Sequence, residues 1–511
     1  MITIKNPIQR GFYPDPSICR VEENYYMVNS TFAYAPGIPI FMSKNLRDWV
    51  QIGHVLERKE QLCLERAKVS EGIYAPTIRY NDGIFYVIAT NVSSGGNFYV
   101  TAKRPEGPWS DPIFLENTPG IDPSLFFDEK VCYYIGQRTK ENPQYFGDCE
   151  IWIQKLDLLQ QKLVGEVHIL WDGSSKHAVW AEGPHLYRRG KYYYLMIAEG
   201  GTEYNHSVCI ARSKSIGGPY ESCAHNPILT HRHLGHDYSI QNIGHGDLIE
   251  GLDEKWFMVM LGTRPQDGCA ELGRETFLAE IAWEEDWPIV NPGRGKVVLE
   301  QEIAHKKNDQ GIDKSATKGT KMEWSLPLDK RFVGLRENPS NLSLQIQNGN
   351  LSIPILAPTV EDIEVPAYIG TRVLSRTFQV QVQVEAEVIG KEEVGLLYYY
   401  DEMHYIKVVM EYSDCGYDVV VVKQNQGNKE QLGKKQVLGS RHVLSIQGYK
   451  QMLSVKVDNE SIAKQIDLHD LCAERAGGFV GCTVGIYASS QHEKSDNRAI
   501  FSSMSLLFSD E

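Results

Sequence analysis

The sequence lacks the features of a membrane-spanning or secreted protein. It contains no run of eighteen apolar residues, and no charged-then-apolar leader follows Met1. A membrane-spanning helix needs about twenty apolar residues, and a secretory signal needs a basic start followed by an apolar stretch. We therefore expect a cytoplasmic protein that has no membrane partner.

Paired cysteines and basic clusters are also missing. The ten cysteines are scattered and form no CxxC pair, which argues against a zinc site or a disulfide framework and predicts reduced, mostly buried thiols. Lys and Arg number 52 against 66 Asp and Glu, so the net charge is −14. Nucleic acids and anionic membranes attract clustered Lys and Arg, so we expect neither as a partner.

Helical periodicity is absent as well, and a repeat is present in its place. Five aromatic-rich runs begin at Tyr25, Phe85, Tyr133, Tyr193 and Trp256, which are separated by 60, 48, 60 and 63 residues. A unit of this length with several short strands is typical of one four-stranded blade of a β-propeller. We predict an all-β fold with a five-bladed β-propeller over residues 1–300.

Each repeat places one distinctive residue upstream of its aromatic run. Asp15 lies ten residues before its run, and Tyr74, Asp122, Glu182 and His245 lie eleven before theirs. Radial symmetry brings equivalent positions together around a central channel. One such carboxylate would be an ordinary turn residue, but three carboxylates and a histidine in register favour a functional site.

The composition changes near residue 300. Residues 301–322 are polar and charged and contain no aromatic residue, which predicts a linker. Beyond it, residues 378–384 alternate strictly between apolar and polar, and further strand-like runs are separated by turn residues. This pattern predicts a β-sandwich over residues 323–511.

The repeated carboxylates suit glycoside hydrolysis, which needs one protonated and one ionised carboxyl group across the scissile bond. Asp15 on the first blade and Glu182 on the fourth would face each other at the wider separation that admits a water and gives inversion. Asp15 suits the general base. The apolar neighbours of Glu182 would raise its pKa and suit the general acid, and the charge of Asp122 on the third blade would help to keep that pKa high.

The motifs around these residues resemble those of a known family. YPDPS at 13–17, GIDPSLF at 120–126 and EGPHLY at 182–187 resemble, in order and spacing, the three catalytic signatures of glycoside hydrolase family 43. Residues 29–49 and 271–278 match as well, and the second domain resembles the concanavalin-like sandwich of two-domain α-L-arabinofuranosidases and β-xylosidases. The resemblance implies that Asp15 is the base, Asp122 the pKa-modulating residue and Glu182 the acid.

The resemblance also implies roles for four further residues. Phe32 and Tyr74 would wall the sugar subsite, although core aromatics would look the same, and many xylosidase-like relatives carry Trp where Tyr74 stands. Arg274 would bind sugar hydroxyls, with a surface ion pair as the alternative. Phe479 would lie on a loop of the second domain that reaches over the funnel, with a sandwich-core residue as the alternative.

A metal is the one cofactor that the resemblance implies. Related enzymes often place Ca²⁺ in the channel near the histidine that corresponds to His245. Calcium prefers oxygen ligands, so a structural or electrostatic Ca²⁺ would be held by His245 only indirectly, through water. The other histidines, among them His185 and His206, show no spacing typical of a zinc site or a catalytic pair and are interpreted as ordinary polar residues.

These observations favour an inverting exo-glycosidase that removes terminal α-L-arabinofuranosyl and β-D-xylosyl residues from oligosaccharides of arabinoxylan or xylan. The two terminal sugars present similar hydroxyls, so we expect dual activity. One alternative is a non-catalytic carbohydrate-binding propeller, which would lack one of the three carboxylates. Another is a phosphorylase or transferase, which would need a basic phosphate pocket that the sequence does not show. The oligomeric state is left open, and a homo-oligomer is compatible with the sequence.

Overall fold

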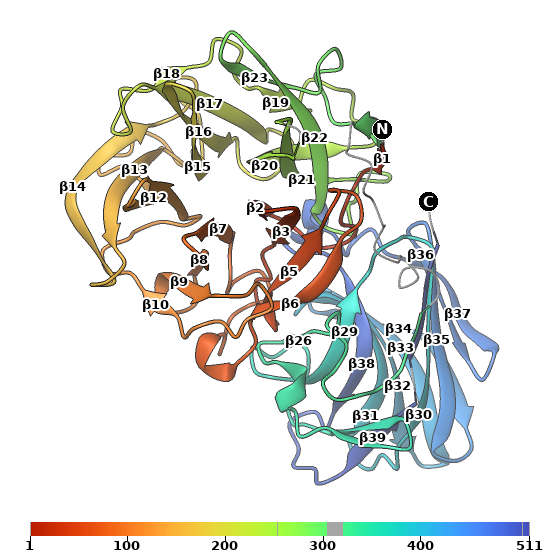
Figure 1. Cartoon of the computed structure of the whole chain (residues 1–511). Coiled ribbons are helices and arrows are strands. Elements are labelled where there is room, and N and C mark those ends of the chain that lie inside the picture. Colours follow the sequence, from red (N-terminus) through yellow and green to blue (C-terminus); the bar gives the residue numbers. More distant parts are fainter. Residues whose placement is uncertain (1, 253, 304–319, 503, 510–511) are drawn as a thin grey trace.

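The computed structural model describes residues 2–252, 254–303, 320–502 and 504–509 (Figure 1). Within them, five antiparallel sheets follow one another from Ser17 to Val290, and each corresponds to one sequence repeat. The sheets consist of β2 (Ser17–Val21), β3 (Asn24–Val28), β5 (Gly37–Ser43) and β6 (Val50–Leu56); β7 (Thr77–Asn81), β8 (Ile84–Asn91), β9 (Gly96–Ala102) and β10 (Ile113–Phe114); β11 (Ser124–Asp128), β12 (Val131–Thr139), β13 (Cys149–Asp157) and β14 (Lys162–Trp171); β15 (Glu182–Arg189), β16 (Tyr192–Glu199), β17 (Ser207–Ser213), β18 (Glu221–Ser222) and β19 (Leu229–Thr230); and β20 (Gln241–Glu250), β21 (Trp256–Thr263), β22 (Glu275–Glu284) and β23 (Trp287–Val290).

The aromatic-rich runs form the second strand of each sheet, namely β3, β8, β12, β16 and β21. These strands are largely buried along both of their faces, as expected for strands in the middle of a sheet that packs against a neighbouring sheet on each side. The first strands contact one another in turn, β2 with β7, β7 with β11, β11 with β15, β15 with β20 and β20 with β2. The sheets therefore close into a ring, with the first strands near its centre (Figure 1).

The two ends of the ring are joined by the N-terminal segment. β1 (Ile2–Lys5) pairs with β24 (Glu300–Ile303), and Gln9 forms an antiparallel bridge with Thr276 of β22. The Gly11 N–H donates to the Glu275 carboxylate at 3.0 Å. The first residues of the chain thus lie along the fifth sheet and fasten it to the first.

The second domain contains two packed sheets. One sheet has the order β29 (Ala367–Arg372), β38 (Thr483–Ser489), β31 (Glu393–Asp401), β32 (His404–Ser413), β33 (Gly416–Asn425) and β34 (Asn428–Val437). The other contains β27 (Gln345–Gln347), β28 (Asn350–Pro354), β39 (Arg498–Phe501), β30 (Phe378–Glu385), β35 (Arg441–Tyr449), β36 (Met452–Val457) and β37 (Glu460–Asp467). In the same sheet, β40 (Met504–Phe508) pairs with β30, and β25 (Thr320–Met322) pairs with β40. Burial along β30 alternates residue by residue, as its sequence predicts.

Regular helix is confined to three short elements of the described chain, α1 (Ala473–Ala476), η1 (Lys59–Gln61) and η3 (Pro339–Asn341). The prediction of an all-β fold with little helix and a C-terminal sandwich is confirmed. The predicted linker, 301–322, includes β25 and most of β24, which pair with β40 and β1, and its residues 304–319 lie outside the described residues. None of the helices described has the length and apolar character needed to cross a membrane.

The two domains share a hydrophobic core. Phe12, Phe32 and Leu272 of the propeller belong to the same buried cluster as the sandwich residues Val333 and Tyr368. A two-residue strand of the propeller, β4 (Tyr34–Ala35), pairs with β26 (Gly334–Leu335) of the second domain. The sandwich is therefore part of the wall that supports the first sheet.

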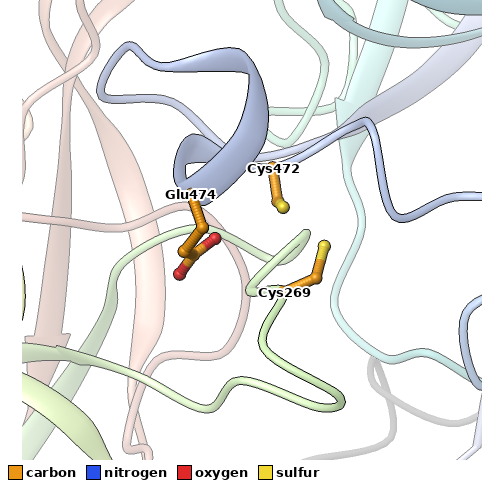
Figure 2. Close-up of side chains that lie close together, drawn as sticks. All are labelled: Cys269, Cys472 and Glu474. Carbon is orange, nitrogen blue, oxygen red and sulfur yellow. The ribbon is translucent and has the colours of Figure 1, made fainter.

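All ten cysteines have free thiols, and only Cys63 and Cys415 are exposed, in agreement with the predicted burial. Cys269 of the propeller lies close to Cys472 and Glu474 of the second domain (Figure 2).

Candidate active site

One pocket collects every residue to which the sequence assigned a role. Its lining includes Asp15, Phe32, Tyr74, Asp122, Glu182, His245, Arg274 and Phe479. The carboxylates come from the start of the first strands, because Asp15 and Asp122 lie two residues before β2 and β11 and Glu182 begins β15. Radial symmetry thus brings equivalent positions of different sheets into one site.

The backbone is unusual at these positions. Asp15, Asp122 and His245 have φ values of 51°, 54° and 48°, in the left-handed region that non-glycine residues seldom adopt. Such conformations concentrate at functional sites, where the surrounding structure holds them. Gly183 follows Glu182, and a Cβ atom there would meet the His245 ring at 2.9 Å. Glycine at this position therefore lets the fourth and fifth sheets approach each other at the pocket.

Asp15 is held as a carboxylate. Its Oδ1 accepts a hydrogen bond from Arg274 Nη1 at 2.9 Å, and its Oδ2 accepts one from the Ser30 hydroxyl. Burial alone would raise the pKa of Asp15, but the positive charge of Arg274, the neighbouring His245 and the Ser30 hydrogen bond outweigh it and hold the pKa below its usual value. Asp15 is therefore ionised at neutral pH, as a general base must be.

Glu182 is shifted in the opposite direction. Burial, followed by the negative charge of Asp15, raises its pKa to about 7, and Arg274 offsets only part of this rise. The group therefore carries a proton up to neutral pH. Two carboxyls of one pocket whose pKa values are driven apart can serve as an acid and a base.

Asp122 differs in detail from the sequence-based interpretation. Burial and the nearby charges of Glu182 and Asp15 raise its pKa well above the usual value, although the backbone of Gly183 donates a hydrogen bond to it. The charge that raises the pKa of Glu182 comes from Asp15. Asp122 and Glu182 thus form a buried pair in which both carboxyls bind protons more tightly than usual.

Arg274 connects the base with the second domain. Its Nη1 also donates to Thr202 Oγ1 at 3.0 Å, and its Nη2 donates to the Phe479 carbonyl at 3.2 Å. The side chain is buried, so it does not form the surface ion pair considered as an alternative. Its Nε is buried without a hydrogen-bond partner among the described residues.

Three aromatic rings form one wall of the pocket. The centroid of Phe32 lies 5.2 Å from that of Tyr74 and 6.1 Å from that of Phe479, with the two phenylalanine rings nearly parallel. Phe479 is 39% exposed and therefore is not a residue of the sandwich core. Its N–H donates to the Ser70 hydroxyl at 2.9 Å, which anchors this segment of the second domain on the propeller.

The sequence analysis missed Thr202 and His206, which also line the pocket. Burial lowers the pKa of His206 to about 3, so the ring is neutral. Its Nδ1 lies 3.0 Å from the Asn242 carbonyl. Both residues belong to the segment between β16 and β17 and share no position with the repeated carboxylates, so no signal in the repeat marks them.

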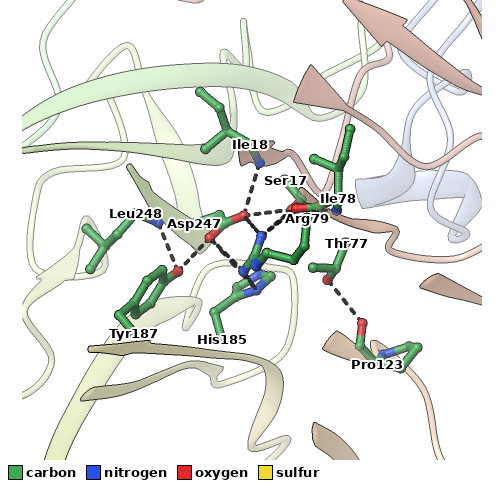
Figure 3. A network of polar contacts seen from close by, with 10 residues as sticks. All are labelled: Ser17, Ile18, Thr77, Ile78, Arg79, Pro123, His185, Tyr187, Asp247 and Leu248. Atoms are coloured by element: carbon green, nitrogen blue, oxygen red, sulfur yellow. Dashed lines mark hydrogen bonds and ion pairs between the residues drawn. The ribbon is translucent and has the colours of Figure 1, made fainter. Parts of the chain in front are cut away.

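A buried ion pair fills the channel near the pocket (Figure 3). Arg79 of β7 donates to Asp247 of β20 at 2.9 Å and lies 2.9 Å from His185 Nδ1 of β15. The same carboxylate accepts from Ser17 of β2 at 2.6 Å and from Tyr187 of β15 at 2.6 Å. One carboxylate therefore ties together the first strands of four sheets.

This network bears on the calcium prediction. Calcium takes six to eight oxygen ligands, whereas Asp247, a fully buried acid of the channel, already accepts hydrogen bonds on both oxygens and faces a guanidinium. Burial lowers the pKa of His245, so its ring is neutral and compatible with a cation beyond a water shell. Among the described residues, these channel groups do not form a direct calcium site. A Ca²⁺ held through water by His245 stays a prediction.

Comparison with known proteins agrees with this geometry. Residues 4–288 match the glycosyl hydrolases family 43, and residues 324–506 match the beta xylosidase C-terminal concanavalin A-like domain. The chain belongs to glycoside hydrolase family 43. This family 43 chain is 43% identical to a xylosidase/arabinosidase of Butyrivibrio fibrisolvens, over 98% of the chain and 99% of the relative.

Two further relatives cover nearly the whole family 43 chain. A non-reducing end alpha-L-arabinofuranosidase of Bacteroides ovatus, BoGH43B, is 35% identical over 98% of the chain and 94% of the relative. Among solved structures, a xylan beta-1,4-xylosidase from Bacillus halodurans superposes with a TM-score of 0.89 at 29% identity, over 99% of this chain and 100% of that one. The propeller and the sandwich are therefore arranged here as in full-length family members.

Proposed function

We propose that this family 43 chain is an inverting, exo-acting glycosidase that releases terminal α-L-arabinofuranosyl and β-D-xylosyl residues from oligosaccharides of arabinoxylan or xylan. One observation carries the proposal. In a single pocket, Asp15 is held ionised by Arg274 and Ser30, while burial and Asp15 keep Glu182 protonated up to about pH 7. This is the pair of protonation states that glycoside hydrolysis requires.

The catalytic step follows from these states. Asp15 removes a proton from a water molecule as the water attacks the anomeric carbon, and Glu182 donates its proton to the departing glycosidic oxygen. Asp15 lies just before the first strand of the first sheet and Glu182 begins the first strand of the fourth, so the base and the acid are supplied by different sheets. Asp122, which forms a buried pair of carboxyls with Glu182, acts on the acid by orientation.

The exo mode is supported by the shape of the site. Phe479 belongs to the second domain, yet it packs on Phe32 and is anchored by Ser70 and Arg274 of the propeller. The pocket is thus bounded on one side by the sandwich, and a chain end fits such a pocket better than the middle of a polymer.

The choice of sugars is supported by the relatives. The Butyrivibrio relative is named for both xylosidase and arabinosidase activity, and the Bacteroides relative is named an arabinofuranosidase. We therefore include both sugars in the proposal. A cytoplasmic location stays a prediction of the sequence, which leaves the oligomeric state open.

The test is a comparison of kcat/KM on 4-nitrophenyl α-L-arabinofuranoside and 4-nitrophenyl β-D-xyloside, followed by proton NMR of early turnover on the better substrate. We expect turnover of both glycosides and a first-formed sugar of inverted anomeric configuration. Retention of configuration, or turnover of neither glycoside, would contradict the proposal.

A further inference from the structure

A second cluster of ligand-bearing side chains lies outside the pocket. In the part of the chain that the structure describes, Cys269, Cys472 and Glu474 form the one group of three or more metal-ligating side chains, and their ligand atoms all lie within 4.8 Å of one another. Figure 2 shows Cys269 on a propeller loop and the other two residues at α1 of the second domain. The cluster therefore spans the contact between the domains.

The cluster is held in place by the surrounding backbone. Both cysteines are fully buried, and their Sγ atoms lie 3.6 Å and 3.2 Å from the same carbonyl, that of His469. Glu474 is exposed, but one of its carboxylate oxygens accepts a hydrogen bond from the Ala270 N–H at 3.1 Å. The carboxylate is thus fixed beside the two sulfurs by the loop that carries Cys269, and its exposed side offers a path for an ion from solvent.

The surroundings of Cys269 favour a positive charge. The Glu474 carboxylate ends beside both sulfurs, and Glu271 lies two residues after Cys269 on the same loop. Arg376 is paired with Glu271 at 2.8 Å and offsets part of that charge. A divalent cation at the sulfurs would replace the thiol protons and interact favourably with both carboxylates.

The ligand set indicates the class of ion. Two thiolates select a soft or borderline cation, and a carboxylate completes a set that Zn²⁺ accepts. Tetrahedral coordination with Zn–S bonds of about 2.3 Å places two sulfurs about 3.8 Å apart, within the span of this cluster. We propose that Cys269, Cys472 and Glu474 form a site for a soft divalent cation such as Zn²⁺, with the fourth position open to water. Binding releases one proton from each thiol.

The two cysteines belong to the same two segments that supply Arg274 and Phe479 to the pocket. Arg274 follows Cys269 by five residues, and Phe479 follows Cys472 by seven. The two segments touch again at Gly273, where a Cβ atom would meet the Gly481 Cα at 2.8 Å. An ion between Cys269 and Cys472 would therefore fasten the Phe479 segment to the propeller at a second point, independently of the catalytic reaction.

Cobalt provides a direct probe, because Co²⁺ bound by thiolates gives a sulfur-to-metal charge-transfer absorption. The full chain, reduced with a non-thiol reductant, should show this absorption with saturation at one equivalent of Co²⁺, and Zn²⁺ should abolish it. Zn²⁺ should also raise the melting temperature, as a ligand of the folded state does. Cys269→Ser and Cys472→Ser should lose the absorption, whereas Cys63→Ser and Cys415→Ser, which change the exposed cysteines, should keep it.

Glu474→Gln separates the site from a folding defect, because the side chain is exposed. This variant should fold and bind Co²⁺ at least about tenfold more weakly, the size of effect seen for partners of a metal site. Absence of the absorption in the wild-type chain, or its persistence in both cysteine variants, would overturn the proposal.

Discussion

At the residue scale, the surroundings of two carboxyl groups in the pocket shift their pKa values in opposite directions. Asp15 has a guanidinium and a hydroxyl as partners, whereas burial and the charge of Asp15 dominate the surroundings of Glu182. Arg274 contributes to both effects, since it stabilises the base and limits the rise in the pKa of the acid.

The two carboxyls should respond differently to mutation. Asp15→Asn preserves the shape of the base but cannot take the proton of the water, so kcat should fall by at least about 10²–10⁴-fold on any substrate. Glu182→Gln should lose as much on a xylo-oligosaccharide but much less on a 4-nitrophenyl glycoside, because nitrophenolate leaves without protonation. Steady-state kinetics of the two variants on both substrates checks this. Equal losses on both substrates for Glu182→Gln would contradict its role as the acid.

The pH profile should report the raised pKa of Glu182. The acid is active when protonated, so kcat/KM on an oligosaccharide should fall about tenfold per pH unit above a midpoint of about 7. The midpoint of the acidic limb should lie below the usual pKa of an aspartate, because Asp15 must be ionised to act as the base and its pKa is lowered. On a 4-nitrophenyl glycoside, Glu182→Gln should lack the alkaline limb. Persistence of that limb in the variant would assign it to another group.

At the scale of elements, the Phe479 segment closes the pocket with a short stretch of the second domain. It leaves α1 through Gly477 and Gly478, both with φ of 79°, and Tyr400 donates to the Gly477 carbonyl at 2.6 Å. The segment is thus fixed at its base by the sandwich and at its tip by Ser70 and Arg274.

Phe479→Ala should therefore raise KM more than it lowers stability, because the ring supplies stacking area and excludes water from the sugar subsite. Phe114 offers a matched control, since it is 44% exposed and packs on Phe98 of the second sheet, away from the pocket. Phe114→Ala should leave KM unchanged. Kinetics and thermal unfolding of both variants decide the point, and an unchanged KM in Phe479→Ala would remove the segment from the site.

The channel network makes a second prediction at this scale. Arg79→Met would leave Asp247 buried without its counter-charge, which should lower the free energy of unfolding by about 3–5 kcal/mol. Arg188→Met removes a surface partner of Asp128 and should cost less than about 1 kcal/mol. Denaturant unfolding of both variants measures the difference. Equal stabilities would show that the four sheets do not depend on this pair.

The sequence predicts those parts of the molecule that repeat. The aromatic runs marked the second strands, and the residues upstream of them marked Asp15, Asp122 and Glu182, because one structural unit recurs at each. Arg79 and Asp247 carry no motif, and their pairing depends on which strands face each other across the ring. Thr202 lies in a connection whose path no local pattern encodes. Cys269 and Cys472 are 203 residues apart in the sequence and meet only through the packing of the domains.

At the scale of the whole molecule, the hydrophobic core that crosses the domain boundary couples the two domains. Phe12 and Phe32 are buried in a cluster made mostly of sandwich residues, and Arg372 of β29 donates to the Phe12 carbonyl at 2.7 Å. Phe12 lies three residues before Asp15, so this core also supports the base.

A chain that ends at residue 303 should therefore lose activity and unfold at a lower temperature, since it exposes these aromatics to water. The intact chain should melt in a single calorimetric transition, because the two domains share the buried cluster that contains Phe12 and Phe32. Two separate transitions in the intact chain, or full kcat/KM in the truncated one, would show that the sandwich is not required.

The ring of sheets closes where the first sheet meets the fifth. Each of the five sheets is built from one continuous stretch of chain, so none of the described N-terminal strands completes the fifth sheet. Instead, residues 2–11 contact β22 and β24 and in this way hold the first and fifth sheets together. Asp15 follows this segment by four residues, whereas Glu182 lies far from both ends of the chain. Proteolytic clipping near the amino terminus, or a fusion partner attached there, would thus disturb the base more than the acid. Such damage would leave the proton donor in place while it displaces the group that activates the water.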